Sequence, residues 1–327
     1  MKILFSSYAY APNIGGIETV SALLAREFVA AGHEIVLVTE TPPPSDTAET
    51  FSVIRQPNFL ALRHWLRWCD VVFQNNISLR HLIPALLACE PVLLVHQTWM
   101  RNTRGEIGWN DQIKRLLVRR VRNVAISTAI ARDVGAACEI IGNPYDDRLF
   151  SLLPGVARDR DIIFVGRLVS DKGADLLLSA VRAIEPAPSV TIVGSGPEEE
   201  KLRASARGLD VLFAGAKSGH ELTELLNRHH IIAISSRWAE PFGVVALEGI
   251  ACGCIAVGSA AGGLPEAIGN CGLTFPNGNK HELRDRLQRL LTDPSLGDSL
   301  RANAPEHLER FRAGNVARRY LEILAGL

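Results

Sequence analysis

The sequence has no excess of either charge and few residues that could cross-link it. Its 327 residues include 35 basic and 35 acidic side chains, so the formal net charge is zero. Neutrality removes the electrostatic argument for a general nucleic-acid binder, which needs a basic surface. Six cysteines are scattered along the chain, and only Cys252 and Cys254 stand close together, without a second Cys or His pair at zinc spacing. We interpret them as reduced thiols and expect no metal site.

Long apolar runs are also missing. The N-terminal apolar segment Ile3-Leu4-Phe5 is much shorter than a signal-peptide core or a membrane span of about 20 residues. We therefore expect a soluble, cytoplasmic protein. Hydrophobic residues make up 47% of the chain and charged residues 21%, which is typical of a globular protein. At roughly 100–200 residues per domain, the length predicts two domains or one very large one.

Short apolar runs typical of buried strands alternate with helical patterns along the whole chain. The first half predicts strands at 3–5, 35–38, 71–73, 92–95, 124–126 and 139–141. After the Pro- and Gly-containing segment 142–160 the pattern restarts, with strands predicted at 162–165, 190–193, 211–213, 231–234, 255–257 and 273–275. This alternation predicts an α/β protein with two doubly wound parallel sheets. We expect domains at 1–150 and 151–312, and a terminal helix at 313–327 that packs back on the first domain.

Ligands of such sheets bind beyond the carboxyl ends of the strands, so the loops there are the candidate sites. Gly15 and Gly16 precede the first helix, where bare N–H groups can approach an anion. Arg167 and Lys172 bracket the loop after the first strand of the second half, and a guanidinium with an ammonium suits a diphosphate. Gly194 belongs to a GxG turn that lets a flat ring lie against the backbone. Taken singly, these motifs also fit ordinary turns and solvated charges.

The loop after residue 234 is the most informative. With Pro241 in the first turn, the predicted helix presents three free N–H groups, those of Phe242, Gly243 and Val244. Glu240 lies just before this helix, and Glu248 lies about two turns inside it. A buried acid there needs a hydrogen-bond partner, which a pair of ligand hydroxyls would supply. The alternative is that Glu240 caps the helix and Glu248 is solvated.

Taken in order, these loops resemble those of the retaining glycosyltransferases of family 4, which have the GT-B fold. The matching segments are densest from 162 to 278 and comprise 15–18, 142–146, 166–168, 172–173, 194–198, 213–215, 240–243 with residue 248, and 262–266. The resemblance implies two Rossmann-like domains facing a cleft, the first on the acceptor side and the second holding the nucleotide sugar. It also implies a UDP- or GDP-sugar donor, retention of anomeric configuration, and neither a metal nor a cofactor.

The resemblance also assigns roles around the donor diphosphate. Arg167 and Lys172 would bind the diphosphate and neutralise its charge as it leaves. Gly15 and Gly16 would close over it from the first domain. The nucleotide base would lie near Gly194 and the turn at 214–217.

The remaining roles concern the two sugars of the donor. Glu248 would accept hydrogen bonds from the ribose hydroxyls, and Glu240, with the backbone at Phe242 and Gly243, would orient the transferred sugar. His96 ends a strand of the first domain, where the family often has a histidine that faces the donor sugar. Taken alone, His96 also fits an ordinary loop histidine.

Two segments of the first domain concern the acceptor. Where the family often places histidines after residues 70–72, this sequence reads Phe73-Gln74-Asn75-Asn76 as a loop, so the acceptor stays open among a glycan, a lipid-linked and a small-molecule hydroxyl. The segment 101–122 has seven basic and two acidic residues, with Trp99 and Trp109 beside them. It predicts contact with anionic lipid headgroups or an anionic acceptor, against the alternative of a solvated helix face.

Other functions fit the same architecture. A sugar-nucleotide epimerase or a phosphorylase would use a similar scaffold, and a nucleotide-binding partner subunit without activity would keep the fold. A nicotinamide dehydrogenase is disfavoured because GxGxxG is absent where it should occur.

Overall fold

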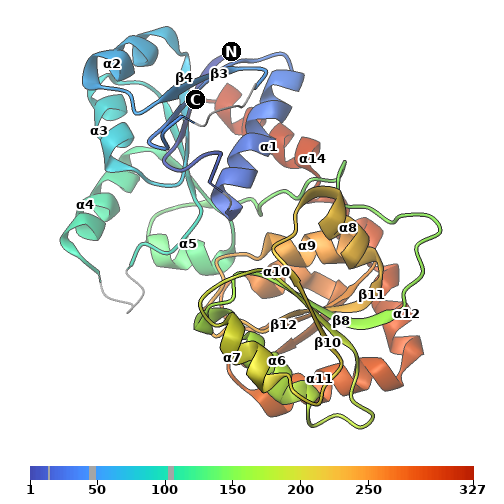
Figure 1. Ribbon diagram of the computed structural model, residues 1–327. Coiled ribbons are helices and arrows are strands. Elements are labelled where there is room, and N and C mark those ends of the chain that lie inside the picture. The colour runs from blue at the N-terminus through green and yellow to red at the C-terminus, as the bar shows by residue number, and fades with distance from the viewer. Residues whose placement is uncertain (14, 44–48, 102–106) are drawn as a thin grey trace. The chain divides into compact units, whose positions relative to one another are not determined.

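The structure, a computed structural model, describes residues 1–13, 15–43, 49–101 and 107–327. The chain divides into two compact units (Figure 1). Unit 1 comprises Met1–Pro144 and Ala313–Leu327, and unit 2 comprises Tyr145–Arg312. No helix among the described residues is both long and apolar enough to cross a bilayer.

Unit 1 is built on a seven-stranded sheet with the order β3-β2-β1-β4-β5-β6-β7, and all paired neighbours are parallel. Its strands are β1 (Lys2–Ser7), β2 (Glu34–Thr39), β3 (Ser52–Arg55), β4 (Val71–Asn75), β5 (Val92–His96), β6 (Arg122–Ala125) and β7 (Glu139–Ile140). The chain leaves β1 in one direction and returns across it to β4, so the sheet is doubly wound.

Right-handed crossovers place the helices of unit 1 on two faces of its sheet. One face carries α1 (Gly16–Ala30), beside which α14 (Ala313–Ala325) packs. The other side carries α2 (Phe59–Trp68), α3 (Leu79–Leu87), α4 (Trp109–Leu117) and α5 (Thr128–Val134), as Figure 1 shows for α2 to α4.

An aromatic cluster explains why the terminal helix belongs to unit 1. The ring of Phe73 on β4 lies 4.7 Å from that of Phe5 on β1 and 5.3 Å from that of Phe28 on α1. The ring of Tyr320 on α14 lies 5.2 Å from Phe73 and is fully buried. Aromatic rings bury large areas, so α14 completes the core of unit 1.

Unit 2 has a six-stranded parallel sheet with the order β10-β9-β8-β11-β12-β13. Its strands are β8 (Arg160–Val165), β9 (Val190–Val193), β10 (Val211–Gly215), β11 (His229–Ile234), β12 (Ile255–Ser259) and β13 (Gly272–Phe275). Its helices are α6 (Ala174–Val181), α7 (Glu199–Ser205), α8 (Gly219–Asn227), α9 (Val244–Ala251), α10 (Leu264–Ile268), α11 (Lys280–Thr292), α12 (Pro294–Ala302) and α13 (Ala304–Glu309).

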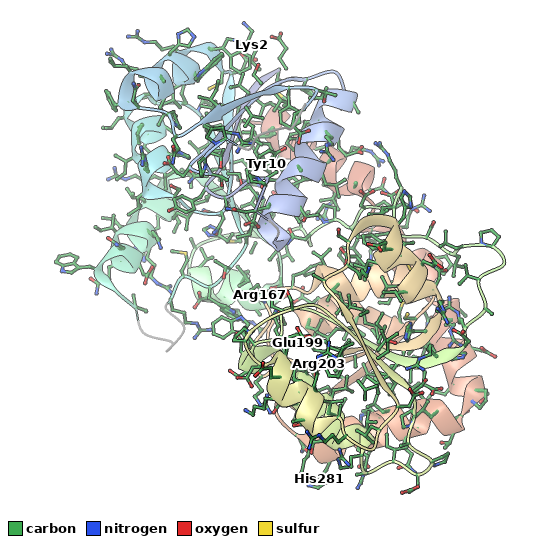
Figure 2. The ribbon with its side chains drawn as sticks, in the orientation of Figure 1. Lys2, Tyr10, Arg167, Glu199, Arg203 and His281 are labelled. Atoms are coloured by element: carbon green, nitrogen blue, oxygen red, sulfur yellow. The ribbon has the colours of Figure 1, made fainter. Side chains whose placement is uncertain are left out.

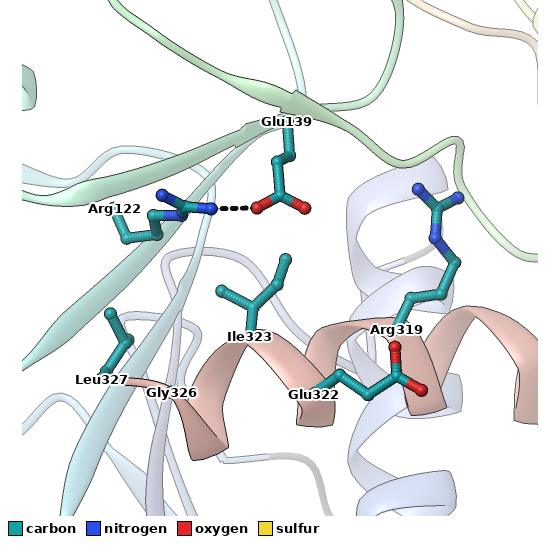
Figure 3. A pocket seen from close by; sticks show the side chains of 7 residues that line it. All are labelled: Arg122, Glu139, Arg319, Glu322, Ile323, Gly326 and Leu327. Carbon is teal, nitrogen blue, oxygen red and sulfur yellow. Dashed lines mark hydrogen bonds and ion pairs between the residues drawn. The ribbon is translucent and has the colours of Figure 1, made fainter.

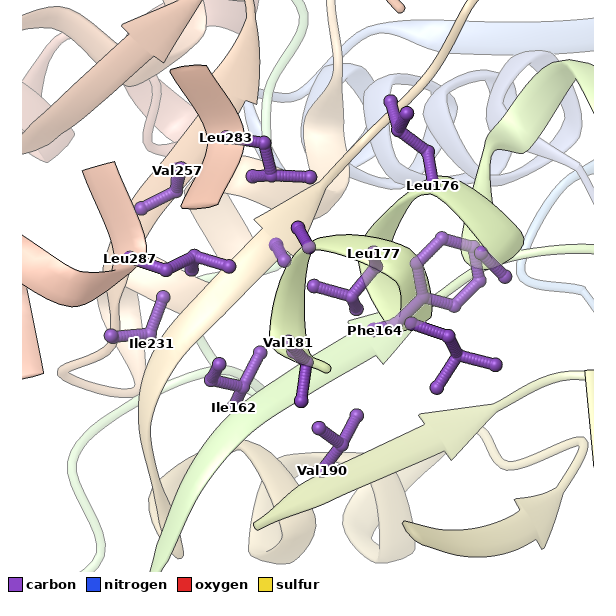
Figure 4. Close-up of a cluster of buried hydrophobic side chains, with 14 of the residues drawn as sticks. Ile162, Phe164, Leu176, Leu177, Val181, Val190, Ile231, Val257, Leu283 and Leu287 are labelled. Carbon is purple, nitrogen blue, oxygen red and sulfur yellow. The ribbon is translucent and has the colours of Figure 1, made fainter. Parts of the chain in front are cut away.

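The main core of unit 2 lies under α6 and α11 (Figure 4). Ile162 on β8 and Val257 on β12 meet Leu177 on α6 and Leu287 on α11, and all four are fully buried. The strands of this sheet contain runs of consecutive buried residues, such as 190–193 and 231–234, which are typical of strands covered on both faces. The prediction of two doubly wound parallel sheets is therefore confirmed. The edge strand β3 and the helices α12 and α13 are elements that the sequence pattern did not reveal.

Candidate functional site

The loops at the carboxyl edge of the unit 2 sheet hydrogen-bond to one another. Gly194 N–H donates to the carbonyl of Gly215 (2.8 Å), and Arg237 N–H donates to that of Asp171 (2.8 Å). Gly194 has φ +141°, and a Cβ built there would lie 1.9 Å from the carbonyl oxygen of Gly166. The close approach of these loops therefore requires glycine at 194.

Lys172 and Glu240, to which the sequence analysis gave separate roles at the diphosphate and the transferred sugar, form an ion pair. Lys172 ends a short 3₁₀ turn after β8, and its Nζ lies 2.6 Å from Oε1 of Glu240. Ser236 Oγ donates to the same oxygen at 2.6 Å. The side chain of Glu240 is only 12% exposed. The structure thus joins residues 68 positions apart into one charged cluster.

Arg167 is exposed in the loop that follows β8 (Figure 2). Within the described parts of the chain, no acid or carbonyl partner is recorded for its guanidinium. Since arginine carries five N–H donors, this side chain offers an uncommitted fork for an anion on the edge of the sheet where Lys172 lies.

The helix after the β11 loop starts later than predicted. α9 begins at Val244, so the prediction that Pro241 occupies its first turn is wrong, and Phe242 precedes the helix. The delay has a tertiary cause: Gly243 has φ +109°, and a Cβ there would lie 2.5 Å from Cδ1 of Leu264. The first N–H groups of α9 have no intrahelical acceptor, so this end of the helix favours an anion or a hydroxyl.

Glu248 lies one turn inside α9, not two, and is partly buried. Burial raises the pKa of its carboxyl to about 7, and the nearby negative charge of Asp146 acts in the same direction. No hydrogen-bond partner is recorded for this carboxyl among the residues that the structure describes. Glu248 therefore has unused hydrogen-bonding capacity at neutral pH.

Asn277, which the sequence analysis did not select, fixes the loop that carries Glu240. Its Nδ2 donates to the carbonyls of Ser236 (3.2 Å), Arg237 (3.3 Å) and Trp238 (3.4 Å). Its Oδ1 accepts from the N–H of Ala261 at 2.8 Å. The signal that could have found Asn277 is its position just beyond the carboxyl end of β13, at the edge where the other candidates lie.

In unit 1, Gly15 and Gly16 lie at the start of α1. Gly15 has an extended backbone, and a Cβ there would lie 2.5 Å from Oε2 of Glu18. A Cβ built on Gly16 would have no other atom within 4 Å. The helix start is therefore open at Gly16, whereas a carboxylate already lies against Gly15.

His96 is completely buried at the end of β5. Its Nε2 bonds Oδ1 of Asn123 at 2.9 Å, and the Asn123 amide donates to two backbone carbonyls, so Nε2 is the protonated nitrogen. Burial lowers the pKa of His96, and its Nδ1 has no partner among the described residues. The side chain thus reaches no solvent from which a sugar could approach.

A buried amide cluster lies at the carboxyl edge of the unit 1 sheet. Gln97 and Asn143 exchange two hydrogen bonds of 2.9 and 2.7 Å, and Gln97 also donates to Asn75 (2.8 Å). Asn75 in turn donates to Ser21 on α1 (2.7 Å). The expected loop at 73–76 is wrong, since β4 continues to Asn75.

A pocket of about 430 Å³ lies elsewhere in unit 1 (Figure 3). It is lined by Arg122, Glu139, Arg319, Glu322, Ile323, Gly326 and Leu327. Arg122 pairs with Glu139, and Arg319 donates to the carbonyl of Ile140 at 3.0 Å. Since β6 and β7 begin here, the pocket is at the amino edge of the sheet, opposite the edge where such sheets bind ligands.

Residues 154–307 match the family model of glycosyl transferases group 1. This stretch covers just under half of the chain and lies within unit 2. D-inositol 3-phosphate glycosyltransferase of Stackebrandtia nassauensis is 33% identical over 172 residues, which cover 47% of this chain and 39% of that protein. Glycogen synthase of Mycobacterium tuberculosis is 27% identical over 366 residues, covering 90% of this chain and 87% of that protein.

A solved structure extends the similarity to the whole chain. HepE of Anabaena, crystallised with UDP and glucose, has a TM-score of 0.82 and 21% identity, with 100% of both chains covered. Sucrose-phosphate synthase of Thermosynechococcus elongatus has a TM-score of 0.80 at 20% identity, again with both chains fully covered. The fold is therefore GT-B.

Proposed function

We propose that this chain is a retaining glycosyltransferase of family 4 that transfers a sugar from a UDP- or GDP-sugar to an acceptor hydroxyl. The carrying observation is the Lys172–Glu240 pair, which lies with the free Arg167 at the carboxyl edge of the unit 2 sheet. The glycosyltransferase names of the relatives and the UDP and glucose in HepE support this assignment.

The donor diphosphate is assigned to Arg167 and Lys172. The ammonium of Lys172 is neutralised by the carboxylate of Glu240. A diphosphate brings at least two negative charges and competes with that carboxylate for the ammonium, while Arg167 offers a second, uncommitted cation. From unit 1, Gly15 and Gly16 are proposed to close over the diphosphate with backbone N–H groups.

The two acids are assigned different parts of the donor. Oε1 of Glu240 already accepts from Lys172 and Ser236. The other carboxylate oxygen is left to orient a hydroxyl of the transferred sugar, together with the backbone N–H groups of Phe242, Gly243 and Val244 at the start of α9. Glu248 is assigned the ribose hydroxyls, which would satisfy its unpaired carboxyl. The base is placed near Gly194.

The proposed reaction breaks the bond between the anomeric carbon and the diphosphate oxygen as the acceptor oxygen attacks from the same face. The acceptor proton passes to the leaving phosphate oxygen, so anomeric configuration is retained without a protein nucleophile. Fixed positive charge stabilises the departing diphosphate, and this electrostatic contribution is commonly the largest in such sites. The proposal includes no metal and no cofactor. It does not assign His96 a contact with the sugar, because His96 is buried.

The acceptor is proposed to be a glycan, lipid-linked or small-molecule hydroxyl in the cytoplasm. Its recognition is assigned to loops of unit 1, since variable loops carry specificity on a rigid scaffold.

A nucleotide panel tests the proposal. We expect UDP or GDP, with the matching sugar nucleotide, to raise the melting temperature and to show slow donor hydrolysis. R167Q and K172Q should lose most of the nucleotide response, while R203Q keeps it, because Arg203 pairs with Glu199 on α7 (Figure 2). No response to any nucleotide, or an unchanged response in K172Q, would overturn the assignment.

A further inference from the structure

Helix α4 of unit 1 presents an apolar stripe to solvent. Trp109, Ile113 and Leu116 follow the i, i+4, i+7 spacing of one helix face, and their exposed fractions are 82%, 38% and 61%. Ile107, just before the helix, is 50% exposed. None of the nine residues of α4 is buried. An amphipathic helix normally covers its apolar face with its own chain, and α4 does not.

The polar side of α4 is fixed to unit 1, so the apolar stripe is held outward. Arg115 donates to the carbonyl of Asp133 at 2.6 Å and lies 3.6 Å from its carboxylate. Arg115 also donates to the carbonyl of Met100 at 3.3 Å. Turning the stripe inward would break these contacts.

The chain at the C-terminal end of α4 is basic. Residues 107–122 contain five basic side chains and one acidic side chain, Asp111. Arg119 and Arg120 directly follow α4, are exposed, and form no recorded ion pair within the described parts of the chain. Of the basic segment predicted from the sequence, Arg104 and Glu106 lie outside the described residues.

A second exposed apolar pair lies on the same side of the sheet. Phe59 and Leu60 begin α2 and are 63% and 72% exposed. Both α2 and α4 belong to the side of the sheet opposite α1, as their right-handed crossovers require (Figure 1). Exposed apolar groups thus occur on two helices of one face of the sheet.

We propose that α4 binds the surface of an anionic lipid bilayer. Trp109, Ile113 and Leu116 enter the interface between headgroups and acyl chains, and Arg119 and Arg120 contact the lipid phosphates. A lipid surface fits better than an acidic protein because the apolar stripe and the cations form one element, with a tryptophan at its start, which is the composition of interfacial helices. The inference rests on unit 1 alone and is independent of the proposed sugar transfer.

Vesicle flotation tests this inference with the full chain. We expect binding to vesicles of phosphatidylcholine with about one third phosphatidylglycerol, and little binding to pure phosphatidylcholine. R119Q/R120Q should weaken partitioning about 30-fold, since each basic side chain near an anionic surface contributes about 1 kcal/mol. R207Q/R289Q removes the same charge from exposed positions of unit 2 and should leave partitioning unchanged.

The apolar stripe has its own variants and control. W109S/I113S/L116S should abolish flotation, whereas L152Q, at a leucine 65% exposed in unit 2, should not. Circular dichroism and thermal melting establish that each variant is folded. Trp109 adds a direct signal, because its fluorescence should shift to shorter wavelength on vesicles and W109F should remove most of that shift.

Three outcomes would overturn the inference. The first is equal binding to neutral and anionic vesicles, and the second is retention of binding in the triple variant. The third is a concentration-dependent dimer that the triple variant abolishes, because a second copy of the chain would then cover the stripe.

Discussion

The ion pair between Lys172 and Glu240 allows a quantitative test of the site. Its atoms are 2.6 Å apart, and the two side chains are 26% and 12% exposed. Coulomb's law gives about 6 kcal/mol at an effective dielectric constant of about 20 and about 1.6 kcal/mol at that of water. Water reaches the lysine, and the carboxylate has lost part of its hydration, so we expect a net coupling of about 2 kcal/mol.

The perturbation is a double-mutant cycle of K172M, E240Q and the double variant. K172M leaves the Glu240 carboxylate poorly solvated, with Ser236 as the one side-chain donor left to it among the described residues. We therefore expect K172M to cost about 2–3 kcal/mol, E240Q about 1 kcal/mol, and the double variant about 2 kcal/mol less than the sum. For a unit of this size, 2 kcal/mol corresponds to roughly 4–8 °C in melting temperature.

Urea unfolding, followed by circular dichroism and tryptophan fluorescence, measures the cycle in the absence of nucleotide. Lys201 provides the control, since its pair with Glu198 is exposed (72% and 29%) and K201M should cost less than about 0.5 kcal/mol. A coupling below about 0.5 kcal/mol for the Lys172 pair would refute the reasoning, because the pair would then behave as an ordinary surface pair.

Three further predictions concern buried or half-buried polar groups of unit 2. Burial lowers the pKa of His229 to about 4, so protonation of this histidine costs stability, up to about 3 kcal/mol, as the pH falls from 6.5 to 4. Urea unfolding of H229Q should show a weaker pH dependence in this range. A pH dependence equal to that of wild type would contradict the prediction. Burial raises the pKa of Glu248 to about 7, so the stability of the fold falls as the pH rises from 4.5 to 7. We therefore expect E248Q to be more stable than wild type at pH 8 by about 1–3 kcal/mol. Calorimetry should show that E248Q binds UDP or GDP more weakly, and an equal nucleotide affinity would remove the ribose role of Glu248. N277A leaves backbone carbonyls of the Glu240 loop without their donor, so it should reduce sugar transfer and cost about 1–3 kcal/mol of stability. A melting temperature equal to that of wild type would show that water replaces the amide.

The strands were predictable because the fold buries them on both faces. Runs such as Ile162–Val165 and Val190–Val193 are apolar at nearly every position, so no alternation needs to be detected. β3 (Ser52–Arg55) was missed because it is a short edge strand with no buried residue. The start of α9 was misplaced because it depends on Leu264, which only the folded chain brings against Gly243.

In the candidate site, too, some features could be predicted from the sequence and others depend on the folded chain. Residue type and position beyond a strand made Arg167, Lys172, Glu240 and Glu248 candidates, and these features are local. The resemblance of the loops to those of a known family then favoured functional roles for these residues over ordinary surface roles. The contact between Lys172 and Glu240 spans 68 residues and depends on the pairing of β8 with β11, which no spacing rule contains. His96 is buried for a similar reason, since its partner Asn123 lies 27 residues away on the neighbouring strand.

Zero net charge conceals two kinds of local arrangement. At Lys172 the positive charge is matched by Glu240, so an anion that binds there competes with a carboxylate, and the pair does not repel the loops that carry it. At Arg167, and at Arg119 and Arg120, the charge is unmatched in the described chain, and a ligand gains the full interaction. A cation that is already paired with a carboxylate binds an anionic ligand by exchanging one anion for another. An unpaired cation binds the ligand without losing an existing partner. The pairing of each cation, more than the total charge of the chain, therefore indicates where an anionic ligand or surface binds.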